Sequence, residues 1–165
     1  MVEEEGGGNK GPDFALRDTK GFSRSMSDIM GKNGLLLIFY RGSFCPYCVG
    51  QLASMSRYTA QLRKLGVNTI AVSVDSVAEN DALSRQLRFS FPILSDSKLT
   101  AIKSYGVAEE KVGASYPEGI SKPAVFLLDR KGNILYRYIS RDFLDRPPTE
   151  ELVNVVKTAI AKMNS

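Results

Sequence analysis

The chain has 165 residues, of which 43% are hydrophobic and 24% charged, which is the size and composition of one globular domain with its own core. Its net charge of +4 comes from Lys and Arg residues that are scattered among acids, so we expect a solvated surface and no nucleic-acid partner. The chain contains no histidine and only two cysteines, which excludes Cys–His and Ser–His catalysis and leaves too few ligands for a structural zinc site. We therefore expect no bound metal.

The N-terminus is predicted to be a flexible lead-in over residues 1–11, because it is rich in acids and glycines and has no apolar period. Its first residues, Met-Val-Glu-Glu-Glu, are acidic where an export signal is basic and then apolar, and the longest apolar run is only strand-sized. We expect a cytoplasmic protein with no membrane partner; a mature form whose signal had been removed would give the same pattern.

Residues 12–165 are predicted to form a single α/β domain. Apolar residues before a turn at residues 18–21 indicate an N-terminal β-hairpin. The continuous apolar run at residues 35–40 is typical of a central strand buried on both faces. Beyond it, apolar residues at three- and four-residue steps predict one amphipathic helix over residues 46–65, closed by Gly66.

The second half of the domain continues the alternation of strands and helices. The β-branched run at residues 67–74 predicts a strand parallel to the first, in a right-handed βαβ unit. Ser76 and Glu79 form a capping box at the start of the next helix. The remaining patterns predict a short strand, a short helix, a long loop, a hairpin and a last helix capped by Thr149, over residues 91–94, 98–105, 107–122, 124–139 and 149–162. This order gives a mixed central sheet flanked by helices.

Both cysteines lie in the segment YRGSFCPYCVG, residues 40–50, directly after the central strand. Proline suits the first position of a helix, so Pro46 places Cys45 at the helix cap. The free amides of the first turn and the helix dipole favour the thiolate of Cys45, whose pKa we expect to be lowered. Cys48 lies one turn further along, where it can act as the resolving thiol.

The two cysteines could instead form a structural disulfide or bind a metal. Closing so short a loop removes less chain entropy than closing a long one, and other metal ligands are missing. The sequence therefore favours a redox-active dithiol.

Five stretches carry a resemblance to known proteins: PDFALRDTKG, LLLIFYRGSFCPYC, VNTIAVSVDS, FPILSD and KPAVFLLDRKGNILYRY. Their order and spacing resemble those of the thioredoxin-like superfamily and, within it, the peroxiredoxin-like AhpC/TSA (redoxin) family. The resemblance covers residues 11–162, nearly the whole chain. It implies a thioredoxin-like fold with a central mixed sheet.

The resemblance is incomplete around the cysteines. Typical peroxiredoxins have a Pro-x-x-x-Thr-x-x-Cys loop, whose cysteine attacks peroxide, and a distant arginine in Arg-x-x-Phe that holds the thiolate. In that register Cys48 takes the peroxidatic position and Cys45 replaces the threonine. Arg41 replaces the proline, and Pro123 stands where the distant arginine would be.

Cys-Pro-Tyr-Cys instead resembles the glutaredoxin motif, in which a cis-proline begins a later strand beside the dithiol. This resemblance implies that Pro123 is cis, whereas an ordinary proline at the start of a strand would be trans. Arg41 is either a group that lowers the thiol pKa or a solvated loop residue. Tyr47 either tunes the redox potential of the dithiol or contacts a substrate, unless it simply packs on the loop. Lesser candidates for the apolar rim and the substrate groove are Tyr40, Phe44, Ser43, Ser121 and Lys122.

These residues lead to three functional hypotheses. The first is a thiol–disulfide oxidoreductase in which Cys45 attacks a substrate disulfide and Cys48 resolves the mixed disulfide. The second is a thiol-dependent peroxidase in which one thiolate is oxidised by a hydroperoxide and the other condenses with it, Cys48 being peroxidatic in the family register. The third is a redox-inactive binding module. The first two need no cofactor, only an external thiol reductant such as a thioredoxin or glutathione system, and the chain is expected to be a monomer or homodimer.

Overall fold

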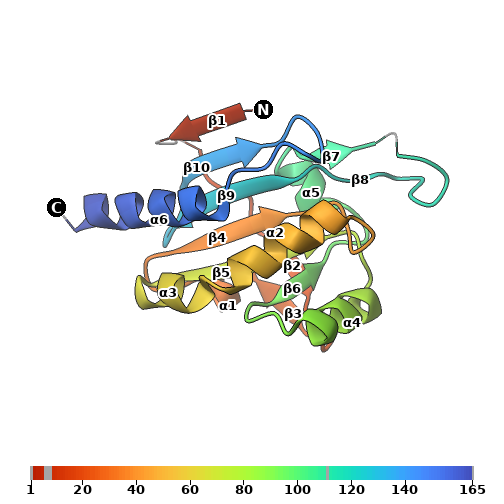
Figure 1. Cartoon of the computed structure of the whole chain (residues 1–165), viewed down its shortest axis with the longest axis horizontal. Helices are drawn as coiled ribbons and strands as arrows, with labels where there is room; N and C mark the ends of the chain where they lie inside the picture. Colours follow the sequence, from red (N-terminus) through yellow and green to blue (C-terminus); the bar gives the residue numbers. More distant parts are fainter. Residues whose placement is uncertain (1, 6–8, 111, 165) are drawn as a thin grey trace.

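The computed structural model describes residues 2–5, 9–110 and 112–164. An eight-stranded mixed sheet, ordered β1-β10-β9-β4-β5-β6-β2-β3, forms the centre of the molecule and has helices on both faces (Figure 1). This confirms the predicted α/β fold with a central mixed sheet and an N-terminal hairpin. None of the helices in the described part of the chain combines the length and apolar character that a bilayer crossing requires.

The elements follow the predicted alternation of strands and helices. The strands are β1 (Val2–Glu5), β2 (Ala15–Arg17), β3 (Ser23–Ser25), β4 (Gly34–Phe39), β5 (Val67–Ser73), β6 (Ile93–Ser95), β7 (Ala108–Glu109), β8 (Ile120–Ser121), β9 (Ala124–Asp129) and β10 (Ile134–Ile139). The helices are α1 (Met26–Ile29), α2 (Pro46–Ser56), α3 (Thr59–Lys64), α4 (Val77–Leu87), α5 (Thr100–Ser104) and α6 (Thr149–Met163).

Strand β4 lies in the middle of the sheet, between β9 and β5, and leads into the cysteine segment. All six of its residues are buried, as the continuous apolar run predicts. It pairs in parallel with β5 and antiparallel with β9. Because β10 is antiparallel to β9, it runs in the same direction as β4. The segments after β4, β5 and β10 therefore leave the sheet at the same edge.

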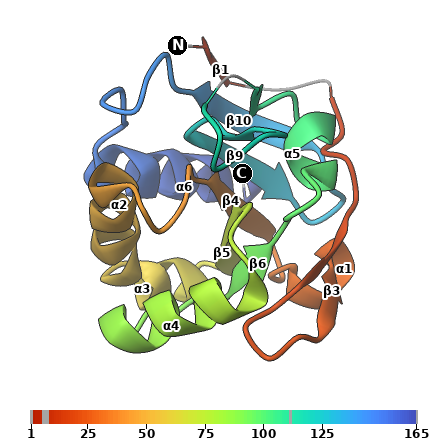
Figure 2. The same cartoon turned by 90° about the vertical axis from the view of Figure 1, so that its right-hand side faces the viewer.

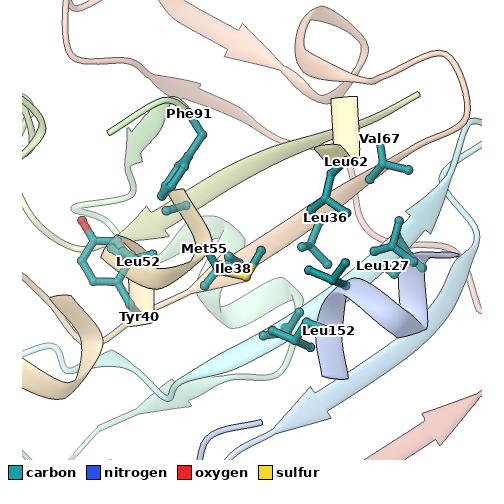
Figure 3. Close-up of a cluster of buried hydrophobic side chains, with 14 of the residues drawn as sticks. Leu36, Ile38, Tyr40, Leu52, Met55, Leu62, Val67, Phe91, Leu127 and Leu152 are labelled. Carbon is teal, nitrogen blue, oxygen red and sulfur yellow. The ribbon is translucent and has the colours of Figure 1, made fainter. Parts of the chain in front are cut away.

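Helices cover the two faces of the sheet with separate apolar cores. Helices α2, α3, α4 and α6 lie on one face, and α1 and α5 lie on the other (Figure 2). In the first core, Leu36 and Ile38 of β4 meet Leu52 and Met55 of α2 and Leu152 of α6 (Figure 3). This packing fixes α2, and with it the cysteines, against the end of β4.

The single helix predicted over residues 46–65 is instead two helices, α2 and α3, with a break between them. At the break, the hydroxyl of Thr59 donates to the carbonyl oxygen of Ser56 at 3.1 Å, and the hydroxyl of Ser90 donates to the same oxygen at 3.0 Å. Hydroxyl groups that bond nearby carbonyls compete with the helix hydrogen bonds. The apolar period continues through the break because both helices pack on the same face.

Three smaller features also differ from expectation. The segment predicted to be a flexible lead-in contains strand β1, residues 2–5, which pairs with β10. Residues 1 and 6–8 of this segment lie outside the described part. The long loop contains the two-residue strands β7 and β8, paired with each other. Thr149 is the first helical residue of α6 and Pro148 holds the cap position, because the Thr149 hydroxyl shares a hydrogen bond of 2.7 Å with the Ser54 hydroxyl.

Candidate active site

The two cysteines occupy the N-terminus of α2, as the sequence predicts. Cys45 is the cap residue, with extended backbone angles of φ −98° and ψ 107°, and Pro46 is the first helical residue. The amide of Cys45 donates to the carbonyl of Gly42 at 3.1 Å, which closes the turn between β4 and the helix. Both cysteines are free thiols, and Cys45 is 3% exposed while Cys48 is fully buried.

A buried carboxyl group, that of Asp75, binds the backbone of the turn that precedes Cys45. The amide of Ser43 donates to Oδ2 of Asp75 at 2.7 Å. Asp75 follows β5 and is only 2% exposed, and burial raises the pKa of its carboxyl above the ordinary value. Its other oxygen, Oδ1, has no hydrogen-bond partner among the described residues. The cysteine turn is thus anchored to the neighbouring strand by one strong hydrogen bond.

Two donors point at the sulfur of Cys48. The backbone amide of Arg41 donates to it at 3.4 Å, and Nη2 of Arg146 donates to it at 3.0 Å. The same Nη2 lies 3.8 Å from the sulfur of Cys45. Arg146 belongs to the segment between β10 and α6, which passes beside the first turn of α2 (Figure 2).

The surroundings shift the pKa values of the two thiols in opposite directions. Burial raises the pKa of Cys45, but hydrogen bonds from the Cys48 thiol and the Cys48 amide, the charge of Arg146 and a hydrogen bond from the Arg41 side chain outweigh it. The pKa of Cys45 is therefore lowered from 9.0. Burial and the hydrogen bond to Cys45 raise the pKa of Cys48 to about 11, despite Arg146. Of the two thiols, Cys45 is therefore the one that ionises first, and Cys48 is the hydrogen-bond donor to it.

Arg146 is the site residue that the sequence analysis missed. Its context, Arg-Pro-Pro before the last helix, predicts only an approach to that helix. The signal that could have found it is topological. In the hairpin at residues 124–139 the first strand is antiparallel to β4, so the second strand is parallel to β4 and the residues after it emerge at the edge where the cysteines lie.

Arg41 and Tyr47 contact aromatic side chains next to the cysteine turn. The guanidinium of Arg41 lies 5.6 Å from the ring centre of Phe44 and 5.5 Å from that of Phe143, and it forms an ion pair with Glu109 at 3.8 Å. The ring of Tyr47 lies 5.5 Å from that of Phe143. Three of these rings are substantially exposed: Phe44, Tyr47 and Phe143. They form an exposed aromatic cluster next to the cysteine turn, which we call the aromatic rim.

Tyr40 and Ser121, two of the lesser candidates, are buried and form hydrogen bonds within the fold. Tyr40 is fully buried, and its hydroxyl donates to Oδ1 of Asn80 at 3.1 Å. Ser121 is also buried and donates to the carbonyl of Lys122 at 2.8 Å.

The prediction of a cis bond before Pro123 is wrong, because the described part of the chain contains no cis peptide bond. Pro123 is a buried residue just before β9, and its carbonyl accepts the amide of Ser140 at 2.9 Å. This backbone pairing with the segment after β10 is compatible with a trans bond. Pro123 thus acts as an ordinary proline at the start of a strand.

The arrangement can carry out two-electron thiol chemistry without another redox group. Once the Cys45 sulfur has been oxidised, the Cys48 sulfur can attack it, expel the group that it carries and close a disulfide. Within the described residues there is no group of three Cys, Asp or Glu side chains arranged to hold a metal ion.

Comparisons with known proteins give a consistent result. The sequence profile of the AhpC/TSA family matches residues 8–137. The chain is 33% identical to a putative peroxiredoxin bcp of Coxiella burnetii over 129 residues, which are 77% of this chain and 83% of the relative. It is 27% identical to peroxiredoxin Bcp of Escherichia coli over 152 residues, covering 91% of this chain and 94% of the relative.

Plant relatives and solved structures agree with these matches. The 2-Cys peroxiredoxin BAS1 of Spinacia oleracea is 29% identical over 155 residues, and the match covers 88% of this chain but 56% of the relative. Among solved structures, AhpC of Enterococcus faecalis superposes with a TM-score of 0.82 at 23% identity, covering 98% of both chains. Peroxidoxin BcpB of Mycobacterium tuberculosis gives a TM-score of 0.81 at 19% identity, covering 98% of this chain and all of the other. The structural matches establish a shared fold.

Proposed function

This chain belongs to the AhpC/TSA family and is a thiol-dependent oxidoreductase; from this premise we propose that it reduces hydroperoxides with the dithiol of Cys45 and Cys48. The observation that carries the proposal is the geometry of the pair: Cys45 caps α2, Cys48 lies in its first turn, and Nη2 of Arg146 lies 3.8 Å and 3.0 Å from their sulfurs. The peroxidase activity is that of the second hypothesis from the sequence, which the family relatives favour over the first, but the roles proposed below for the two sulfurs are the reverse of those in that hypothesis.

The proposed reaction begins at Cys45. Its thiolate attacks the terminal oxygen of the hydroperoxide, the O–O bond breaks, and the alkoxide leaves as an alcohol after taking up a proton. Cys45 becomes a sulfenic acid. The Cys48 sulfur loses its proton and attacks the Cys45 sulfur, an S–S bond forms and water leaves. An external dithiol then reduces the Cys45–Cys48 disulfide by exchange.

Cys45 rather than Cys48 is proposed as the attacking sulfur. The family register places Cys48 at the peroxidatic position, but its pKa is raised to about 11 and its side chain is fully buried. A thiol with that pKa is almost entirely protonated at neutral pH, and the thiolate is the nucleophile. Cys45 has the lowered pKa and the greater exposure.

The test is a set of rapid-mixing measurements of hydroperoxide consumption by the reduced wild-type protein and by Cys45→Ser and Cys48→Ser variants. The wild type is expected to consume hydrogen peroxide or cumene hydroperoxide far faster than a free thiol and to end as the Cys45–Cys48 disulfide. Dimedone is expected to trap a sulfenic acid on Cys45 in the Cys48→Ser variant. Trapping on Cys48 in Cys45→Ser at the wild-type rate would reverse the assignment, and a wild-type rate equal to that of free thiol would reject peroxidase activity.

Thiol–disulfide exchange is the second candidate function, favoured by the Cys-x-x-Cys pair at a helix N-terminus. It predicts that the reduced protein cleaves the interchain disulfides of insulin, and that Cys48→Ser accumulates a mixed disulfide through Cys45. A protein that reduces peroxide but leaves insulin intact would limit the dithiol to peroxidase chemistry. In both cases the reductant is a thioredoxin or glutathione system. The cytoplasmic location and the monomeric or dimeric state stay predictions.

A further inference from the structure

The backbone turn between β4 and α2, residues 41–44, is bonded to the end of the neighbouring strand through Asp75. The Cys45 amide closes the turn on itself by donating to the carbonyl of Gly42 at 3.1 Å. The Ser43 amide instead donates to Oδ2 of Asp75, the second residue after β5, at 2.7 Å. The other oxygen of Asp75, Oδ1, would lie 3.3 Å from a Cβ atom at Gly42. Both carboxyl oxygens therefore face the segment that carries Cys45.

Asp75 is itself held in place by two strands. Its amide donates to the hydroxyl of Ser73 in β5 at 3.1 Å, and its carbonyl accepts the hydroxyl of Ser95 in β6 at 2.6 Å. The residue is 2% exposed, and Oδ1 has no hydrogen-bond partner among the described residues. Because a buried oxygen without a partner costs free energy, stability alone does not explain an aspartate at this position.

The groups around Asp75 leave the Ser43 amide as the main support of its ionised form. The titratable groups that face Asp75 are Glu79 in the first turn of α4, Tyr40 directly after β4 and Tyr116 in the long loop. Burial raises the pKa of Asp75, the Ser43 amide lowers it, and the charge of Glu79 raises it. No lysine or arginine among the described residues forms an ion pair with Asp75. Since a carboxylate accepts an amide more strongly than a neutral carboxyl does, ionisation tightens the bond to the turn.

We propose that the ionised carboxyl of Asp75 positions the dithiol by holding the Ser43 amide. This bond keeps the sulfur of Cys45 beside that of Cys48 while the disulfide closes. Asp75 is a positioning residue, since it acts through the backbone of the turn.

The effect of Asp75 falls mainly on the second chemical step. In the reduced protein the Cys48 thiol already donates a hydrogen bond to Cys45, so a fixed turn keeps the two sulfurs near the geometry of attack. The first step needs less of this order, because the oxidant that meets Cys45 is free to move. The inference deepens the proposed function and rests on it for the peroxide substrate, but disulfide closure is measurable with another oxidant.

The test is a stopped-flow reaction of the reduced protein with dithiobis(nitrobenzoic acid). The Cys45 thiolate attacks one sulfur of the reagent, the S–S bond of the reagent breaks, and one thionitrobenzoate leaves. Cys48 then loses its proton to solvent and attacks the Cys45 sulfur, and the second thionitrobenzoate leaves as the protein disulfide forms. Only the first phase depends on the reagent concentration, so the second phase measures closure.

The variants separate the hydrogen bond from the charge. Asp75→Ala removes the acceptor, whereas Asp75→Asn keeps a neutral acceptor for the Ser43 amide. Asp96→Asn is the matched control, since Asp96 is also 2% exposed and accepts two backbone amides, but those of Thr100 and Ile102 in α5. Thermal unfolding of each variant accompanies the kinetics.

Asp75→Ala is expected to slow the second phase by about tenfold while changing the first phase much less. Asp75→Asn should recover part of this loss, and Asp96→Asn should close at the wild-type rate. The ratio of the wild-type closure rate to that of Asp75→Asn should rise with pH above 3.8 and level off once the carboxyl is fully ionised. Taking this ratio removes the pH dependence that both proteins share, that of Cys48.

A ratio of one at every pH would overturn the inference, even if Asp75→Ala does not fold. A second phase that slows equally in Asp75→Asn and Asp96→Asn would overturn it as well, because the effect would then follow the loss of any buried carboxyl. If closure depends on Asp75 but the wild type consumes no hydroperoxide, the inference stands and the proposed peroxidase function fails.

Discussion

At the scale of single residues, the site depends on buried charged groups whose protonation is linked to folding. Asp75 has a raised pKa because it is buried, although its bond to the Ser43 amide opposes the shift. A carboxyl whose folded pKa lies above its unfolded value binds more protons in the native state. Stability therefore falls as the pH rises from the ordinary value of 3.8 through the folded pKa, and the loss persists at neutral pH.

Asp75→Asn tests this linkage. The amide oxygen can still accept the Ser43 amide, while the charge is removed and the unpartnered Oδ1 is replaced by a donor. We expect the stability of the variant relative to the wild type to increase from pH 4 to pH 7, because only the wild type must ionise a buried carboxyl over this range. Thermal unfolding at both pH values measures it. Asp81→Asn, on an exposed ion pair with Arg85, is the control and should show no such pH dependence.

The hydrogen bond between the two thiols gives a second prediction at this scale. The Cys48 thiol lowers the pKa of Cys45 by donating to it. Cys48→Ser keeps a donor at this position and Cys48→Ala removes it. We expect Cys45 to be alkylated more slowly in Cys48→Ala than in Cys48→Ser at pH 7, by a factor on the order of ten. Equal alkylation rates in the two variants would show that the thiol donor has no effect on Cys45.

At the scale of elements, the position of the cysteine turn depends on how closely β4 approaches β9. Gly34 pairs with Asp129 across the two strands. A Cβ atom at Gly34 would lie 2.4 Å from the carbonyl oxygen of Leu128, a distance at which the strand backbone must move. The glycine is required here by the close approach of the strands.

Gly34→Ala is therefore expected to destabilise the protein by roughly 2 kcal/mol or more, because backbone atoms cannot relax as a flexible side chain would. Gly50→Ala is the matched control, since a Cβ there meets nothing within 4 Å and the residue lies inside α2. Alanine should stabilise that helix by about 0.5 to 1 kcal/mol. Urea unfolding of both variants makes the comparison, and a Gly34→Ala midpoint no lower than that of the wild type would contradict the argument.

At the scale of the whole molecule, the fold follows from local patterns, whereas much of the site does not. Runs such as residues 35–40 and the capping box at Ser76 are short-range signals, and both appear where the sequence predicts them. The cap position of Cys45 is also local, since Pro46 determines it. Arg146 reaches Cys48 across 98 positions of the chain. No local pattern encodes such a contact, because it depends on the direction of β10 and the path of the loop after it.

The whole molecule also links redox state to stability, through three contributions with different pH dependence. The Cys45–Cys48 disulfide constrains the unfolded chain by about 2 kcal/mol for so short a loop, whatever the pH. In the reduced protein the lowered pKa of Cys45 adds stability that grows as the pH rises through the folded pKa and is complete above 9.0. The raised pKa of Cys48 acts the other way, removing stability as the pH rises from 9.0 to about 11.

The stability of the reduced form relative to the oxidised form should therefore rise as the pH approaches 9.0 from below and fall between 9.0 and about 11. Thermal unfolding of the dithiothreitol-reduced and diamide-oxidised protein across this range measures the difference. Reduced Cys48→Ser, which keeps the Cys45 thiolate, should retain the rise below pH 9 and lose the fall above it, while the double Cys→Ser variant should show neither. A difference between the two forms that stays constant with pH would mean that the thiolate of Cys45 is not stabilised by the fold, and that the electrostatic account of the dithiol is wrong.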